Sequence, residues 1–230
     1  MNATTAGKQS QAAPAAKQER VKPSSRKTRS YGVITVAVLA ILAAMAFDTK
    51  VVKIGSADDF RAKVFSPQTY GAEAFPKIKA DVEARAVDAV KLAQAITADK
   101  QAATKTYGVP AGIGAVFPVK FTGTVTERKA NYNVVKIDGM DPAITVRVQT
   151  GPALNGTDLR DATGKITFGQ FVNQIQYQDA GSAINNEVKK DVLATLKPDE
   201  LTGKTVSVVG AFTLINPKNW QVTPVSIEVK

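Results

Sequence analysis

Residues 119–126 read VKFTGTVT, with an apolar residue or glycine at each odd position and a polar residue at each even one. Successive side chains of a strand point to opposite faces, so this alternation predicts a β-strand with one buried and one solvated face. The same alternation predicts four more strands in the second half of the chain. They cover residues 133–137, 144–148, 204–214 and 221–229.

A helix is expected among these strands, at residues 179–196. Apolar residues recur there every four positions from Ile184 to Leu196, and Pro198 is a stop signal. Three strands, one helix and two strands then follow one another, which is the order of an OB-type barrel. We predict an α+β fold in which residues 111–230 form an OB-like, five-stranded β-barrel with a helix between strands 3 and 4. Such barrels bind oligonucleotides or oligosaccharides through one face and its loops.

A helical segment is predicted before the strands, within residues 48–110. Apolar residues recur at helical spacing over residues 75–107. Asp88 and Asp99 each have a side chain suited to an N-cap, which would divide this stretch into shorter helices. Gly108, followed by a proline two residues later, is the expected end of the helical segment.

Residues 31–47 form a charge-free run rich in Val, Ile, Leu and Ala. Its length is at the short end of the roughly 17–25 residues that span a bilayer as a helix, so we expect a transmembrane anchor. A core helix would have polar positions along one face, whereas this run has only Thr35. A cleaved signal peptide is the main alternative, because Ala44-Met45-Ala46 has the small-x-small pattern of a cleavage site. The polar lead before the run is longer than a typical signal peptide has, which favours the anchor.

Residues 1–30 hold most of the basic excess of a chain whose net charge is +10, since they contain seven Lys or Arg and one Glu. Their Ala, Gln, Ser, Thr and Pro composition predicts a disordered tail. Basic residues flanking a membrane helix stay on the cytoplasmic side, so we expect residues from about 48 onward on the opposite side. The exported part then has no nucleic acid as partner, and residues 31–47 bind the membrane.

The chain contains neither cysteine nor histidine. This excludes disulfides, thiol nucleophiles and catalytic triads with an imidazole base, and it removes the usual ligands of zinc, haem and iron–sulfur clusters. Acidic pairs at Asp58-Asp59 and at Asp138 with Asp141 lack the spacing of a Ca²⁺-binding loop, so we expect solvated turn residues there. With no phosphate-binding glycine loop and no Gly-x-Ser-x-Gly motif, we expect no catalytic residues, no metal and no cofactor.

The connection at residues 151–178 is the longest in the predicted barrel and concentrates polar side chains that suit recognition of a sugar or peptide. Arginine offers a planar set of donors, amides offer paired donors and acceptors, and aromatic rings offer stacking faces. Loops presented by a rigid scaffold commonly carry function. The candidate binding residues are Arg160, Asp161, Asn173, Gln174 and Tyr177.

Structural roles for these side chains are the alternative. A long loop needs polar side chains to satisfy its own backbone, and Arg160 with Asp161 could serve as internal pins of the connection. Phe168, Phe171 and Tyr177 could fill the mouth of the barrel.

Five short motifs occur from residue 151 onward. They read Gly151-Pro152, Gly156-Thr157-x-Leu159-Arg160-Asp161-Ala162, Phe168-x-x-Phe171-x-Asn173-Gln174-Ile175-x-Tyr177, Gly203-Lys204-Thr205-Val206-Ser207 and Gly210-Ala211-Phe212-Thr213. Through these motifs the chain resembles, over roughly residues 50–230, the bacterial family named domain of unknown function 2291, described as predicted periplasmic lipoproteins. The resemblance implies an exported OB-like fold and frequent encoding beside ribose-type sugar ABC transporters, with no established activity. Because this chain has no cysteine to acylate, the hydrophobic helix is the expected anchor.

Together these features predict a single-pass protein of the bacterial inner membrane with a periplasmic C-terminal domain, or a periplasmic protein if cleavage occurs near Ala46. We expect a non-enzymatic accessory or binding protein, with a small carbohydrate or a sugar ABC transporter component as the partner that the resemblance implies. A structural protein of an envelope complex is one alternative. The other is a hydrolase with two carboxylates facing each other at roughly 5 to 9.5 Å across a cleft.

Overall fold

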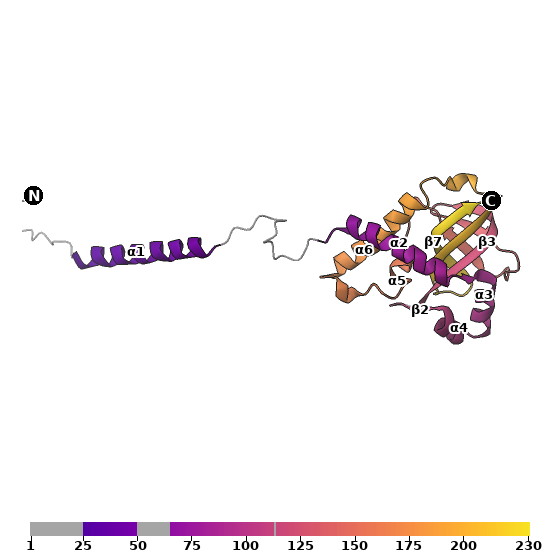
Figure 1. Cartoon of the computed structure of the whole chain (residues 1–230), viewed down its shortest axis with the longest axis horizontal. Helices are drawn as coiled ribbons and strands as arrows, with labels where there is room; N and C mark the ends of the chain where they lie inside the picture. The colour runs from indigo at the N-terminus through magenta and orange to yellow at the C-terminus, as the bar shows by residue number, and fades with distance from the viewer. Residues whose placement is uncertain (1–24, 50–64, 113) are drawn as a thin grey trace, which may run out of the picture. The chain divides into compact units, whose positions relative to one another are not determined.

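The computed structural model describes residues 25–49, 65–112 and 114–230. The chain divides into two compact units, Met1–Ala62 and Lys63–Lys230. The second unit contains both the helices expected within residues 48–110 and the strands expected after them (Figure 1).

The first unit is described from Ser25 onward, where helix α1 (Ser25–Asp48) begins. Six residues of the tail predicted to be disordered are therefore helical, and residues 1–24 lie outside the described part. Residues 31–48 have a mean hydropathy of 2.1 and none of them is buried. At about 1.5 Å per residue this stretch is about 27 Å long, close to the hydrocarbon thickness of a bilayer. The helix is thus long and apolar enough to cross a membrane, a property that signal sequences share.

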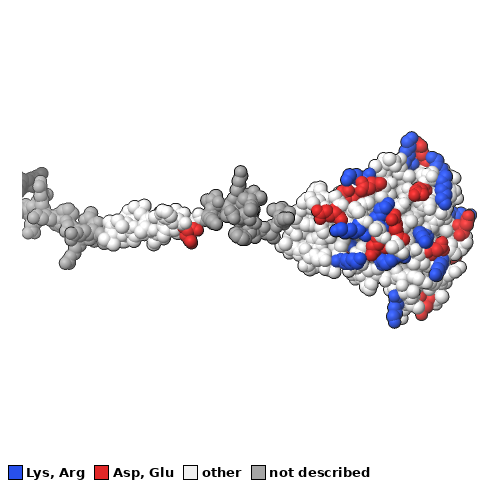
Figure 2. Space-filling model, in the orientation of Figure 1, with Lys and Arg blue, Asp and Glu red and all other residues white. Residues whose placement is uncertain are grey.

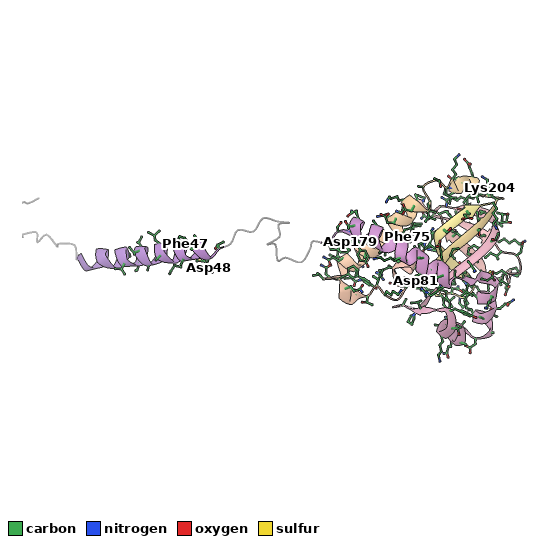
Figure 3. All side chains as sticks on the ribbon, viewed as in Figure 1. Phe47, Asp48, Phe75, Asp81, Asp179 and Lys204 are labelled. Carbon is green, nitrogen blue, oxygen red and sulfur yellow. The ribbon has the colours of Figure 1, made fainter. Side chains whose placement is uncertain are left out.

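The charge-free run of residues 31–47 lies within α1, after the basic residues Arg26, Lys27 and Arg29. Figure 2 shows no charged atoms on the described surface of the helix until its last residue. Phe47 and Asp48, labelled in Figure 3, form this end. On the visible face of the second unit, acidic and basic side chains are interspersed, so no single-sign patch forms there (Figure 2).

Helix α2 (Pro67–Arg85) opens the second unit and begins eight residues before the predicted helical stretch. Ser66 is its N-cap, and the Ser66 hydroxyl accepts a hydrogen bond from the Thr69 N–H. Proline at the first helical position suits this start, because its missing N–H would be unpaired there in any case. The helix also contains Pro76, a residue that usually marks a helix boundary.

Helices α3 (Ala89–Ala98) and α4 (Lys100–Tyr107) follow, and both predicted N-caps are confirmed. The Asp88 carboxylate accepts hydrogen bonds from two backbone N–H groups at 3.0 and 3.1 Å. The Asp99 carboxylate does the same at 2.8 and 3.0 Å. Gly108 is the C-cap of α4, as predicted.

All five predicted strands are present, but the sheet has seven strands. The two additional strands are only two residues long, too short for an alternating pattern to reveal. In chain order the strands are β1 (Val87–Asp88), β2 (Val109–Pro110), β3 (Ala115–Lys129), β4 (Tyr132–Lys136), β5 (Thr145–Gln149), β6 (Thr205–Thr213) and β7 (Asn219–Val229).

The sheet order is β1-β3-β4-β5-β7-β6, and β6 also pairs with β3. Strands β5 and β7 are parallel, as are β1 and β3, whereas the other pairs are antiparallel. The exact five-stranded barrel of the prediction is not confirmed, because the sheet has seven strands and the long strand β3 pairs with the short strands β1 and β2 as well as with β4 and β6.

The helix predicted between the third and fourth long strands is α6 (Gln174–Asp191), which lies beside α2 (Figure 1). Its predicted bounds of 179–196 are wrong at both ends. Asn173 caps the start, and the helix closes with hydrogen bonds from the N–H groups of Val192 and Leu193 to the Val188 carbonyl. The predicted connection at 151–178 thus ends at the helix start and contains two short helices, α5 (Asp158–Asp161) and η1 (Phe168–Gln170).

Apolar side chains form two clusters on the two faces of the strands. In the first, the sheet packs against α3, and the rings of Phe117 and Trp220 flank Phe212 with centroids 5.8 and 4.5 Å away. In the second, α2 and α6 cover the other face. Its buried members include Phe75, Ile78, Leu159, Ile184, Val188 and Val225.

Candidate functional site

Helix α5 is fixed to strands β6 and β7 by one carboxylate. Asp158 accepts hydrogen bonds from the Thr213 hydroxyl, from the Thr213 N–H at 3.1 Å and from the Thr223 hydroxyl at 3.1 Å. Burial raises the pKa of Asp158, an effect that these hydrogen bonds oppose and that the negative charge of Asp161 reinforces. Both oxygens of Asp158 are therefore occupied by bonds that hold the fold.

Arg160 and Asp161 form a two-pronged ion pair. The Nε and Nη2 atoms of Arg160 lie 2.8 and 3.0 Å from the two carboxylate oxygens of Asp161. Asp161 also accepts hydrogen bonds from the Thr157 hydroxyl at 2.7 Å and from the Tyr177 hydroxyl at 3.4 Å. Arg160 is 8% exposed.

Tyr177 completes this group from the first turns of α6. The Arg160 guanidinium lies 3.6 Å from the centroid of its ring, and Arg160 Nη1 donates to the Tyr177 carbonyl at 3.3 Å. Burial raises the pKa of the Tyr177 phenol, and the neighbouring Asp161 carboxylate raises it further, while Arg160 lowers it. Three of the five predicted site residues thus form one contiguous group, which we call the α5–α6 cluster: Arg160, Asp161 and Tyr177.

Asn173 and Gln174 stand apart from the α5–α6 cluster. The Asn173 side chain accepts a hydrogen bond from the Gln176 N–H at 2.9 Å, so it serves as the N-cap of α6. Gln174 is exposed on the first turn of the helix. The Tyr177 N–H donates to the Asn173 carbonyl at 3.3 Å, as a backbone bond of the first helical turn. Within the described part of the chain, no side-chain hydrogen bond or ion pair joins Asn173 or Gln174 to the cluster.

The aromatic residues of the connection lie outside the sheet interior. The Phe171 ring is 5.4 Å from that of Tyr177, 5.5 Å from Tyr70 and 5.6 Å from Phe65, measured between centroids. Phe168 contacts Tyr177 at 5.8 Å. The alternative that these rings fill the mouth of a barrel is therefore wrong, because they join the starts of α2 and α6.

A cleft of about 620 Å³ lies beside the α5–α6 cluster. Its walls come from α5 with the turn before it, from the β6–β7 turn, and from strands β5 and β7. Arg160 and Asp161 line it, and so do amide side chains. The amides belong to Asn155, Asn216, Asn219 and Gln221.

Arg147, on β5, also lines this cleft and was not among the predicted residues. It pairs in register with Gln221 on β7, so both side chains lie on the same face of the sheet. Its guanidinium lies 5.1 Å from the centroid of the Tyr132 ring, and its Nε is buried without a hydrogen-bond partner. In the sequence it is one of several polar residues alternating with valine, which does not distinguish it from a solvated strand position.

The acidic pairs show no sign of a cation site within the described residues. No group of three or more acidic side chains that could hold a metal occurs there. Asp141 accepts a hydrogen bond from the Ala143 N–H at 2.8 Å, as a turn residue does. Asp58 and Asp59 lie outside the described residues.

Comparison with solved structures identifies a relative in fold. The chain is similar to an OB-fold protein from Thermotoga maritima, with 19% sequence identity and a TM-score of 0.61, over 73% of this chain and all of that one. At this identity the likeness shows the fold alone, and it agrees with the predicted OB class. A search of curated proteins finds no match.

A family model describing predicted periplasmic lipoproteins, domain of unknown function 2291, matches residues 35–228. The match spans most of α1 and nearly all of the second unit, and it agrees with the resemblance noted from the motifs after residue 151. The chain therefore belongs to this family of predicted periplasmic lipoproteins of unknown function.

Proposed function

We propose that the protein is a membrane-anchored periplasmic binding protein whose cleft takes a small polar molecule without transforming it. The observation that supports this proposal best is the cleft itself, where amide side chains and the half-buried Arg147 guanidinium offer hydrogen bonds to a ligand. Ligand sites are typically concave and contain a few well-placed polar groups, and a volume of about 620 Å³ is in their usual range.

The same geometry disfavours the hydrolase alternative. A carboxylate-dependent hydrolase needs one acid and one base free to act on substrate. Both carboxylates of the cleft are already engaged, Asp158 by two threonines and Asp161 by Arg160, Thr157 and Tyr177. Binding alone makes no such demand on them.

A small carbohydrate suits the donors and acceptors of the cleft, because amides bind sugar hydroxyls in either direction. The proposed protein partner is a component of a sugar ABC transporter. An interaction protein without a small ligand is the rival function.

A thermal-shift screen of the full chain in detergent tests the proposal, with pentoses, hexoses, polyols and nucleosides as probes. A probe at 100 times its Kd stabilises the folded state by about 2.7 kcal/mol, which corresponds to a rise in Tm of about 5–10 °C for a chain of this size. We expect at least one probe to produce such a rise.

Two variants locate the response. Asn219→Trp places a large side chain in the cleft and should abolish the shift, whereas Asn186→Trp, exposed on α6 outside the cleft, should preserve it. A shift that survives Asn219→Trp would place binding elsewhere, and no response from any probe would favour the interaction protein.

A further inference from the structure

Four charged side chains line the cleft, and three of them already have partners. Arg160 and Asp161 neutralise each other at 2.8 Å, and Asp158 accepts hydrogen bonds from Thr213 and Thr223. The Arg147 side chain has no ion pair and donates no hydrogen bond to any described residue. It is the one charged group of the described cleft that remains available to a ligand.

No described protein group near Arg147 accepts a hydrogen bond from its guanidinium. Its Nε is buried without a hydrogen-bond acceptor, which is rare for a buried donor in a folded protein. The Tyr132 ring lies beside the guanidinium at 5.1 Å, and a ring provides no strong acceptor. Arg147 as a whole is half-buried and lines the cleft, so the outer edge of its guanidinium, with the two Nη groups, is the part that a molecule in the cleft can reach.

We propose that Arg147 binds an oxyanion of the ligand, either a carboxylate or a phosphate. The planar donor edge of a guanidinium matches the two oxygens of such a group and can bind both at once. Amides of Asn219 and Gln221, on the neighbouring strand β7, lie at the same cleft and can bind hydroxyls of the same molecule. This inference rests on the proposed function and names the class of ligand.

The two acidic residues of the cleft do not oppose an anion strongly. The charge of Asp161 is balanced by Arg160 at 2.8 Å. The oxygens of Asp158 accept hydrogen bonds from the Thr213 hydroxyl and N–H and from the Thr223 hydroxyl, so its charge is already stabilised by the fold. The electrostatic attraction of Arg147 is thus not cancelled by a neighbouring pair.

Matched probes test the inference with the full chain in detergent. D-gluconate and sorbitol have the same number of carbons and differ in the carboxylate, and inorganic phosphate supplies the other oxyanion. Ionic strength is held constant with NaCl, because exposed charges respond to salt. We expect gluconate or phosphate to raise the Tm and sorbitol to raise it much less at the same concentration.

Variants of Arg147 connect this response to the residue. R147Q should raise the Kd of the anion that responds at least about 30-fold, since losing one partner of a buried charged hydrogen bond costs affinity of that order. R147K keeps the charge without the planar donor edge and should retain part of the affinity. K136Q removes a charge from an exposed position on β4 and should bind as the wild type does. The substitution R147Q removes no side-chain hydrogen bond within the described protein. Without a probe, the Tm of the variant should therefore lie within a few degrees of that of the wild type.

The outcomes separate this inference from the proposed function. If neutral sugars raise the Tm in an Asn219-dependent way and neither anion does, the cleft binds ligands but the oxyanion inference is wrong. An anion response that R147Q leaves unchanged would also overturn it. If no probe responds, both proposals fall.

Discussion

Two arginines line the cleft, and their guanidinium groups differ in the contacts they make. The Arg160 guanidinium is bound by a carboxylate, a carbonyl and an aromatic face, all from this chain. The Arg147 guanidinium has a ring beside it and no acceptor among the described residues. The contacts of Arg160 indicate a stabilising role, whereas Arg147 is the arginine on which our binding proposal rests, although the predicted site contained the first and not the second.

The stabilising role of Arg160 predicts that Arg160→Ala lowers the free energy of unfolding by about 3 kcal/mol, because it leaves the largely buried Asp161 carboxylate without its counter-charge. Urea unfolding of the full chain in detergent measures this loss. Lys165→Ala is the control, since Lys165 is 77% exposed and pairs with Asp81 of α2 (Figure 3). Such an exposed pair contributes little to stability. An Arg160→Ala variant that keeps its stability but loses ligand binding would show that Arg160 binds the ligand and does not stabilise the fold.

The predicted grouping of polar residues was partly right for a physical reason. Arg160, Asp161 and Tyr177 do meet, because the connection brings α5 beside the first turns of α6. The capping role of Asn173 was not foreseen, because it follows from the helix start, which the apolar spacing placed at residue 179 instead of 174. Arg147 could not be singled out, since its buried Nε depends on which strands become neighbours.

The packing of α2 on α6 depends on a close approach at one residue. A Cβ added to Gly71 would lie 2.8 Å from the Ala183 carbonyl oxygen, which belongs to the backbone of α6. A backbone atom in a packed helix cannot move aside as a flexible side chain can. The two helices would have to separate to admit even a methyl group.

Gly71→Ala therefore tests whether this helix pair is under steric constraint. Alanine raises helix propensity by about 1 kcal/mol over glycine, whereas overpacking a core typically costs about 1–3 kcal/mol. We expect the steric cost to exceed the gain, with a net loss of about 1 kcal/mol and a Tm about 2–4 °C lower by thermal denaturation.

Gly169→Ala is the matched control, because nothing lies within 4 Å of the added Cβ there. This variant should melt at or near the wild-type temperature. If Gly71→Ala instead stabilises the protein, the helices can adjust their spacing and the constraint is absent.

Strands and caps were predictable where the local signal was long or chemically specific. The alternation of residues 119–126 persists in the burial of β3, and Gly123 stands at an inward position where a Cβ would lie 2.5 Å from the Lys136 carbonyl oxygen. Asp88 and Asp99 cap helices as their side chains allow. Strands β1 and β2 were missed because two residues form no period, and only pairing with β3 makes them extended.

The chain contains an apolar helix and a separate folded unit. For the folded unit, the sequence predicted the class of fold but not its strand pairing. Local patterns predict that three long strands, a helix and two long strands follow one another along the chain, and the OB-fold relative agrees with this class of fold. The pairing of β3 with both β4 and β6 is a long-range property that no local pattern contains. If α1 spans a membrane as we expect, its orientation decides on which side the folded unit lies.

Charge asymmetry predicts this orientation. Residues 1–30 hold seven Lys or Arg and one Glu, whereas Asp48 follows the apolar run on its other side. Short flanking segments rich in Lys and Arg remain in the cytoplasm, so the folded unit should lie in the periplasm. The alternative of a cleaved signal leaves the folded unit in the same compartment but removes the anchor.

An alkaline phosphatase fusion after Lys230 tests the orientation, because this enzyme requires the periplasm for activity. We expect an active fusion in the membrane fraction and an intact mass that includes residues 1–46. Replacing Arg26, Lys27 and Arg29 with Glu removes the basic flank and should lower the phosphatase activity, whereas the same three changes at Lys8, Lys17 and Lys22, farther from the apolar run, should lower it less. A stable but inactive wild-type fusion would contradict the orientation. An active fusion in the soluble fraction, with a mass that corresponds to a chain starting after Ala46, would show that α1 is a cleaved signal. The proposed binding protein would then be free in the periplasm.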